Sequence, residues 1–343
     1  MILTIILFIA ILILVHEVGH FLLARNFKIK VEEFGIGFPP RIFKIKKNET
    51  IYSFNLIPLG GFVRLFGENE KIGSEESFSD QPPLNRFFVV IAGIVFNIIL
   101  AYFIFSFLIL GGFTRPIFDN SPGTLMVFEV ATSSPASLAG IKKGDFILGF
   151  SSFEEFKEFI NKNLGKEIEF LIKRGKKVFS VKVIPRENFS KKEGAIGVSL
   201  FQVEYIQKGF PFNFFYGMKM TVDYLTQMFV KIYQILKNLI KKTDVPKDVV
   251  GPVGIFKILL DLKDFGLKYM IFIFGILSLN LAVINLLPFP ALDGGRLIFI
   301  LFEILSGKEI NKEIESIFHL VGFAILVLIA ILITIRDIKL FIL

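Results

Sequence analysis

Four long apolar runs divide the chain, and each is long enough to cross a lipid bilayer. They occupy residues 1–24, 87–113, 267–293 and 317–335. Because a membrane-spanning helix needs about 20 predominantly apolar residues, we expect four transmembrane helices. The pattern predicts a polytopic α-helical membrane protein with polar segments between its spans. The connection between the third and fourth spans is expected to be a loop.

The polar segment at residues 25–86 contains an apolar and polar alternation that Gly and Pro interrupt. Such a pattern predicts short β-strands, here a membrane-associated hairpin or sheet. Gly61, Phe62 and Val63 in this segment could pair with an extended peptide as an added strand. The alternative is a hairpin that contacts no peptide. We favour pairing, because Phe62, Val63 and Leu65 would otherwise be exposed.

Two further segments lie between the second and third spans. Residues 122–200 have mixed polarity, short alternating stretches and one helical piece, which predicts an inserted α+β domain. Residues 201–266 show apolar positions at helical spacing and a basic end. They predict an amphipathic helical linker on the membrane surface.

Composition supports the membrane assignment and excludes several other classes. The chain is 53% hydrophobic with a mean hydropathy of +0.65, which excludes an ordinary soluble domain. A net charge of +8 fits contact with anionic membrane lipid. Because no basic stripe is interleaved with aromatic residues, we expect no nucleic-acid partner. The chain has no cysteine, which excludes disulfides and thiol chemistry.

Charge also predicts the orientation of the chain in the membrane. Residues 25–86 carry ten Lys or Arg, whereas the N-terminus and the segment after the second span carry few. The positive-inside rule therefore places residues 25–86 in the cytoplasm. With four spans, the N-terminus, the inserted domain and the C-terminus are then expected outside the cytoplasm.

The candidate chemistry lies inside the first span, where the sequence reads HEVGH. A charged group near the bilayer centre costs about 2.5–3.5 kcal/mol, so His16, Glu17 and His20 need a reason to be there. Residues four apart share one face of a helix, so both imidazoles can bind one ion while Glu17 reaches a water. This is the H-E-x-x-H arrangement of metalloproteases.

This span has two simpler interpretations. A signal peptide would have a basic region before the apolar run and a small-residue cleavage site after it, and neither is present. The histidines could instead bond to neighbouring helices, but Ser, Thr or Asn usually has that role in membranes. Metal binding is the interpretation that we favour.

A catalytic zinc needs a third protein ligand, and three residues are candidates. Pro288 and Pro290 break the third span just before Asp293, and such breaks persist only where protein or a wet cavity surrounds them. Asp293 is favoured because it lies at the inner end of an antiparallel span, at the depth of HEVGH. The other candidates are Glu303 and His319, although a histidine at the start of a span is ordinarily an interface residue.

These motifs together resemble a known family. HEVGH in the first span, NLLPFPALDGGR in the third and the segments LIPLGGFVRLFGE and GPVGI are similar to the site-2 protease family of intramembrane zinc metalloproteases. The bacterial branch with the regulator-of-sigma-E protease is the most similar. The resemblance implies that His16, His20 and Asp293 hold Zn²⁺ and that Glu17 is the general base. It also implies that Asn280 and Asn285 contact the substrate strand.

The resemblance extends to location and partners. It implies a multi-pass protein of the bacterial cytoplasmic (inner) membrane that cleaves single-span membrane proteins, such as an anti-sigma factor. The SPASLAGIKKGD turn in the inserted domain resembles that of a PDZ domain, which would bind a peptide or a C-terminus. The same domain could instead act only as a size filter, and the sequence does not separate these roles.

The chain departs from the family pattern in two places. It has room for one PDZ-like domain where some members have two. In the second span the family's Gly-Pro-x-x-Asn pattern reads from Gly93 to Asn97 without the proline. Asn97 is most simply explained by a hydrogen bond between helices.

Two other functions stay open: a non-catalytic receptor or chaperone that uses the PDZ-like domain, and a metal transporter with an intramembrane ion path.

Overall fold

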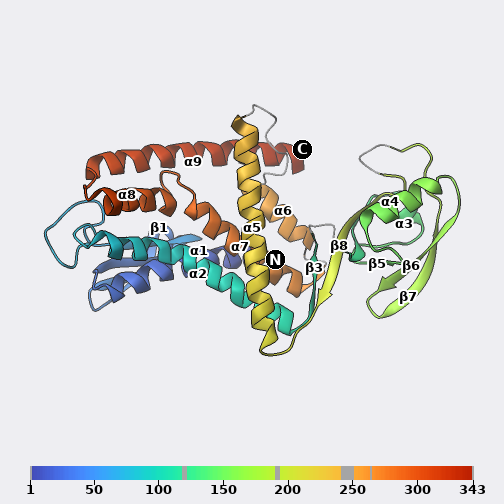
Figure 1. Cartoon of the computed structure of the whole chain (residues 1–343), viewed down its shortest axis with the longest axis horizontal. Helices are drawn as coiled ribbons and strands as arrows, with labels where there is room; N and C mark the ends of the chain where they lie inside the picture. The colour runs from blue at the N-terminus through green and yellow to red at the C-terminus, as the bar shows by residue number, and fades with distance from the viewer. Residues whose placement is uncertain (1, 118–121, 190–193, 241–250, 263–264, 342–343) are drawn as a thin grey trace. The chain divides into compact units, whose positions relative to one another are not determined.

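The computed structural model describes residues 2–117, 122–189, 194–240, 251–262 and 265–341 (Figure 1). The chain forms two compact units. The first comprises residues 1–107, 214–263 and 269–343, and the second comprises residues 108–213 and 264–268.

The first unit is built on four long helices: α1 (Ile2–Asn26), α2 (Pro83–Leu110), α7 (Leu267–Leu286) and α9 (Lys312–Phe341). All four are long and apolar enough to cross a membrane, so the four predicted helices are confirmed in type and order. α7 ends at Leu286, before the predicted limit of 293, because the prolines that follow cannot continue the helical hydrogen bonding.

Three further helices belong to this unit: α5 (Phe212–Ile240), α6 (Pro252–Leu262) and α8 (Asp293–Ser306). α8 occupies the connection that the sequence predicted as a loop, so that expectation was wrong. Its buried positions Leu297 and Ile300 repeat at helical spacing and pack into the core of this unit. Of the predicted linker at 201–266, residues 241–250 and 263–264 lie outside the described residues.

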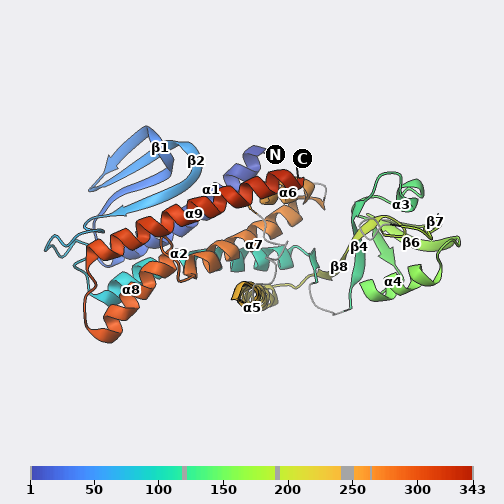
Figure 2. The same cartoon turned by 90° about the horizontal axis from the view of Figure 1, so that it is seen from above.

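α5 and α6 are each tied to a long helix by close contacts. α5 runs across the other helices in Figure 1 and is seen end-on in Figure 2. Gly217 of α5 lies against Ser106 of α2, where a side chain at the glycine would clash. The buried Asp337 of α9 accepts hydrogen bonds from the backbone N–H groups of Gly251 and Gly254, both at 2.9 Å. A carboxylate at this position satisfies the free N–H groups at the start of α6.

A long antiparallel hairpin, β1 (Val31–Lys47) and β2 (Thr50–Leu65), completes the first unit (Figure 2). Its strands are much longer than the short strands expected from the glycines and prolines, because register shifts bend them without ending them. β2 curls so far that Gly35 of β1 pairs with both Ser53 and Phe62. The last part of β2 is therefore an outer edge of this small sheet.

The second unit contains a six-stranded antiparallel sheet in the order β3-β8-β4-β5-β6-β7. The strands are β3 (Phe113–Pro116), β4 (Thr124–Val130), β5 (Phe146–Leu148), β6 (Ile168–Arg174), β7 (Lys177–Val183) and β8 (Val198–Ile206). Helices α3 (Pro135–Leu138) and α4 (Phe153–Lys162) accompany it. β3 and the end of β8 extend the sheet beyond the predicted limits of 122–200.

Alternating residues of this sheet form the core of the second unit. Leu125, Ile147 and Ile172 are fully buried against Phe156 of α4. The turn before β5 is held by the buried Asp145, which accepts a hydrogen bond from the backbone of Lys142 at 2.7 Å and binds Arg174 through both carboxylate oxygens. A bidentate pair of this kind fixes the geometry of the turn.

Candidate metal centre

Three side chains from distant parts of the sequence converge in the first unit. His16 and His20 lie one turn apart on α1, and Asp293 is the first residue of α8. The Nε2 atoms of the two histidines are 3.2 Å apart. Asp293 Oδ2 lies 3.0 Å from Nε2 of His16 and 3.5 Å from Nε2 of His20. The structure thus brings together two imidazoles and the favoured third candidate.

The spacing of these three atoms fits a tetrahedral metal ion. Ligands that bind zinc at about 2.0–2.2 Å in tetrahedral geometry lie about 3.3–3.6 Å from one another. The three observed separations fall within a few tenths of an ångström of that range. Two neutral imidazoles and a carboxylate are also a usual donor set for catalytic zinc, with the fourth position open.

Close contact between α1 and α2 holds the two histidines in place. A side chain at Gly93 of α2 would lie 2.5 Å from Nε2 of His20 and 2.7 Å from Cε1 of His16. Gly19 of α1 is equally restricted, because a Cβ there would lie 2.6 Å from the carbonyl oxygen of Ala92. Only glycine at these positions lets the two helices approach this closely.

Asp293 is positioned by the start of α8 and by the segment before it. A Cβ on Gly294 would lie 2.2 Å from the carbonyl oxygen of Leu287, and one on Gly295 would lie 2.4 Å from that of Phe289. The two glycines therefore allow the segment after α7 to fold tightly against the first turn of α8. The helix N-terminus also favours the negative charge of Asp293.

Each histidine has a partner on its other ring nitrogen. Nδ1 of His20 lies 2.8 Å from the carbonyl oxygen of Val89, and Nδ1 of His16 lies 3.3 Å from Nδ2 of Asn97. Such partners orient metal-binding histidines. Asn285 approaches from α7, with its Nδ2 3.5 Å from Nε2 of His16. Asn280 lies on the same helix and is half-buried.

Glu17 lies beside these ligands and the edge of the hairpin. A cavity of about 200 Å³ is lined by His16, Glu17, His20 and Asp293 together with Phe62 and Val63 of β2. A Cβ on Gly61 would lie 3.4 Å from Cγ of Glu17. The outer edge of β2 at residues 61–63 therefore lies directly against the candidate base.

An ion pair at the rim of this cavity joins α8 to the loop after β2. Nη1 of Arg296 donates to Oε1 of Glu68 at 2.6 Å, and Oε2 of Glu68 lies 3.3 Å from the backbone nitrogen of Leu65. Burial alone would lower the pKa of Arg296, but the nearby charge of Glu68 and their hydrogen bond raise it overall. The pair holds the end of β2 next to the first turn of α8.

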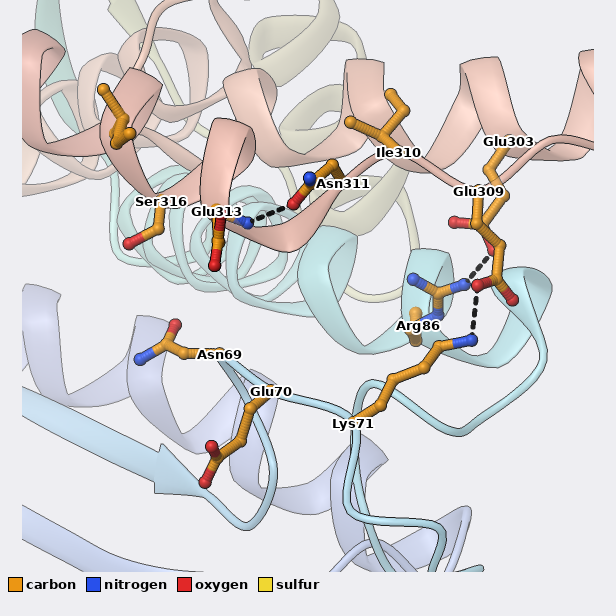
Figure 3. A pocket seen from close by; sticks show the side chains of 11 residues that line it. Asn69, Glu70, Lys71, Arg86, Glu303, Glu309, Ile310, Asn311, Glu313 and Ser316 are labelled. Carbon is orange, nitrogen blue, oxygen red and sulfur yellow. Dashed lines mark hydrogen bonds and ion pairs between the residues drawn. The ribbon is translucent and has the colours of Figure 1, made fainter.

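The other two candidates for the third ligand have different partners. Glu303 pairs with Arg86 of α2 at 2.5 Å, beside a separate cavity of about 910 Å³ (Figure 3). Nδ1 of His319 on α9 accepts a hydrogen bond from the backbone of Ala291 at 2.9 Å. His319 thus holds the segment before Asp293 and does not join the three converging atoms.

The sequence of nearly the whole chain matches one protein family. The model of Peptidase family M50 matches residues 4–329, a range that contains every residue of the candidate centre. The chain belongs to Peptidase family M50.

Named relatives of this M50 chain share most of its length. A protein of Clostridium acetobutylicum, assigned by name to the zinc metalloproteases, is 32% identical over 335 residues, covering 96% of this chain and 94% of the relative. The regulator of sigma-W protease RasP of Bacillus subtilis is 28% identical over 414 residues, covering 96% of both. The chloroplastic membrane metalloprotease ARASP of Arabidopsis thaliana is 33% identical, covering 95% of this chain and 76% of the relative.

Sequence reasoning missed several residues that shape this M50 site. Gly93, Glu68 and Arg296 were given no role, and Asn97 was assigned only a bond between helices. Gly93 and Asn97 are four residues apart in an apolar span, so they share one helix face. That spacing was the available signal. The pairing of Glu68 with Arg296 leaves no recognisable pattern in the sequence, because 228 residues separate them.

Proposed function

We propose that this M50 chain is an intramembrane zinc metalloendopeptidase of the site-2 type, which cleaves single-span membrane proteins. The observation that carries the proposal is the convergence of His16, His20 and Asp293 at metal-ligand spacing, with Glu17 in the same cavity. The four membrane-length helices and the names of the relatives point to the same activity.

In this proposal His16, His20 and Asp293 hold the zinc ion through Nε2, Nε2 and Oδ2. When bound, the ion would supply Lewis acidity toward a water and toward the carbonyl oxygen of the scissile bond. Glu17 accepts the proton of the attacking water and delivers it to the leaving amine nitrogen. A peptide would enter this cavity beside Phe62 and Val63, which line it.

Substrate binding requires an unwound strand, because the backbone groups of a helix are already paired with one another. We propose that the outer edge of β2 at Gly61, Phe62 and Val63 pairs with this strand by β-addition. Asn285, whose amide reaches the ligand cluster, and Asn280 one to two turns before it would bind other freed backbone groups. The carbonyl carbon of the scissile bond would then lie beside the water that Glu17 activates.

The remaining proposals concern location and the second unit. We propose a multi-pass protein of the bacterial cytoplasmic membrane, with the N-terminus, second unit and C-terminus outside the cytoplasm. The second unit is a PDZ-like domain that binds a peptide or C-terminus, or limits the size of substrates. We propose an anti-sigma factor as one substrate; the Bacillus subtilis relative, which is named a regulator of sigma-W protease, supports this class.

Substitution of the proposed base tests this function. Purified full-length protein and its Glu17→Gln variant are reconstituted with a single-span membrane substrate, and cleavage and zinc content are measured. We expect Glu17→Gln to retain zinc and to cleave about 10²–10⁴-fold more slowly, the usual contribution of a general base. The exposed Glu70→Gln variant is the matched control and should cleave normally. Cleavage by Glu17→Gln at the same rate as the parent protein would refute the proposal.

A further inference from the structure

The side chain of Asn97 is buried between α2 and the candidate ligands with only one of its two polar atoms paired. Asn97 has no exposed surface, and its Nδ2 lies 3.3 Å from Nδ1 of His16. Its Oδ1 has no hydrogen-bond partner among the described residues. Because buried carbonyl oxygens are almost always paired, this orphan atom needs an explanation.

The backbone around Asn97 is fixed, so the side chain cannot simply move away. Ser278 of α7 donates a hydrogen bond to the carbonyl oxygen of Asn97 at 2.7 Å. Gly93, one turn earlier, lies in contact with both histidines. The freedom that remains to Asn97 is rotation of its amide group, which exchanges a nitrogen for an oxygen of nearly equal size.

The two histidines differ in how their protons are fixed. His20 faces the carbonyl oxygen of Val89, which can only accept, so its Nδ1 carries a proton. His16 faces an amide, which can donate or accept. His16 can therefore carry its proton on either nitrogen while remaining neutral, and the orientation of Asn97 selects which.

We propose that the Asn97 amide is a reversible partner that sets the tautomer of His16. With Nδ2 toward the ring, His16 carries its proton on Nε2, and Oδ2 of Asp293 at 3.0 Å accepts it. With the amide rotated by about half a turn, Oδ1 accepts from Nδ1–H, and Nε2 presents its lone pair to the ion. The rotation pairs Oδ1 with Nδ1–H and moves Nδ2 to the place that Oδ1 held.

This inference rests on the proposed function, because it assumes that His16 and His20 bind a divalent ion through Nε2. Asn97 is then a positioning residue that acts through His16. Replacing it with leucine, which has a similar volume and no polar atom, removes the acceptor for Nδ1–H. Loss of such an outer partner typically weakens metal binding 10–100-fold.

The experiment measures zinc affinity and the histidine tautomers of the full-length protein. Zinc affinity is determined by chelator competition for the parent, Asn97→Leu and Thr221→Val. Thr221 is the matched control because it is also buried in a helix, where its hydroxyl donates to the carbonyl oxygen of Gly217 of its own helix. We expect Asn97→Leu to bind zinc about 10–100-fold more weakly and Thr221→Val to match the parent.

The ¹⁵N spectrum of labelled histidine gives a second readout that does not depend on the variant folding. The chain has only three histidines, so each ring can be assigned. On addition of zinc to the parent, we expect the His16 proton to move from Nε2 to Nδ1 while that of His20 stays on Nδ1. Identical His16 tautomers with and without zinc, or parental zinc affinity of Asn97→Leu, would overturn the inference. If zinc shifts neither Nε2 signal, the proposed function fails as well.

Discussion

At the scale of single residues, the absence of a side chain at Gly93 lets the candidate centre form. The two imidazoles occupy the space where a Cβ at this position would lie. Interiors are packed closely enough that even one added methyl group must displace its neighbours. The histidines at Gly93 cannot move without losing their spacing to Asp293.

We therefore expect Gly93→Ala to weaken zinc binding while leaving the helices intact. The added methyl group would displace Nε2 of His20 and the ring of His16 by several tenths of an ångström or more. Chelator competition measures the affinity, and circular dichroism measures the helix content. Gly209→Ala is the control, because nothing lies within 4 Å of a Cβ at that position. Parental zinc affinity of Gly93→Ala would show that the ligands adapt freely.

Some residues of the centre could be predicted from sequence and others could not. His16, Glu17 and His20 form a local sequence pattern. The proline break before Asp293 marks that residue as a candidate ligand. The sequence alone left Glu303 and His319 open as ligands. Their actual partners, Arg86 and the backbone of Ala291, are 217 and 28 residues away, so no local pattern reveals them.

At the scale of elements, a buried ion pair joins α2 to α8 and so helps to fix the helix that begins at Asp293. The side chains of Arg86 and Glu303 are only 4% and 10% exposed and lie 2.5 Å apart. Figure 3 shows the pair at the side of the larger cavity, next to the exposed pair of Lys71 and Glu309. Removing one buried charge leaves the other without compensation.

Glu303→Gln should therefore lower the free energy of unfolding by about 3–5 kcal/mol. The double variant Arg86→Met/Glu303→Leu removes both charges. Its free energy of unfolding should fall much less, because apolar side chains can replace a buried ion pair. Denaturation of the detergent-solubilised protein measures both. The exposed ion pair of Lys71 and Glu309 should contribute little to the free energy of unfolding, so Glu309→Gln is the control. Equal stability of Glu303→Gln and the parent would contradict this account.

Elements with strong periodicity were predicted, and those that depend on distant contacts were not. The four long helices follow directly from apolar length. α8 was not predicted, although Leu297 and Ile300 repeat at helical spacing, and its start depends on close contact of Gly294 and Gly295 with the segment after α7. The length of β1 and β2 was missed because Gly and Pro suggested interruptions that the strands absorb as bulges.

At the scale of the whole molecule, the chain consists of two units with separate cores. The candidate centre lies entirely in the first unit. The core of the second unit is formed by its own sheet and α4. Stability of the second unit and metal binding by the first should therefore be separable.

Ile172→Ala tests this separation. Ile172 is fully buried in the sheet of the second unit, and removal of its side chain should destabilise that unit by about 2–5 kcal/mol. Limited proteolysis should then cleave within residues 122–206 more rapidly than in the parent. We expect zinc affinity to remain parental. A parallel loss of zinc binding would show that the two units do not behave independently.

The central claim is that two histidines and one aspartate from helices far apart in the sequence hold one zinc ion. X-ray absorption at the zinc edge of the purified protein tests it most directly. We expect three protein ligands, all nitrogen or oxygen at about 2.0–2.2 Å, with scattering from two imidazole rings. Asp293→Ala should either keep the imidazole signal and lose one oxygen ligand, or lose the bound zinc altogether. A spectrum without imidazole scattering, or one unchanged by Asp293→Ala, would contradict the claim.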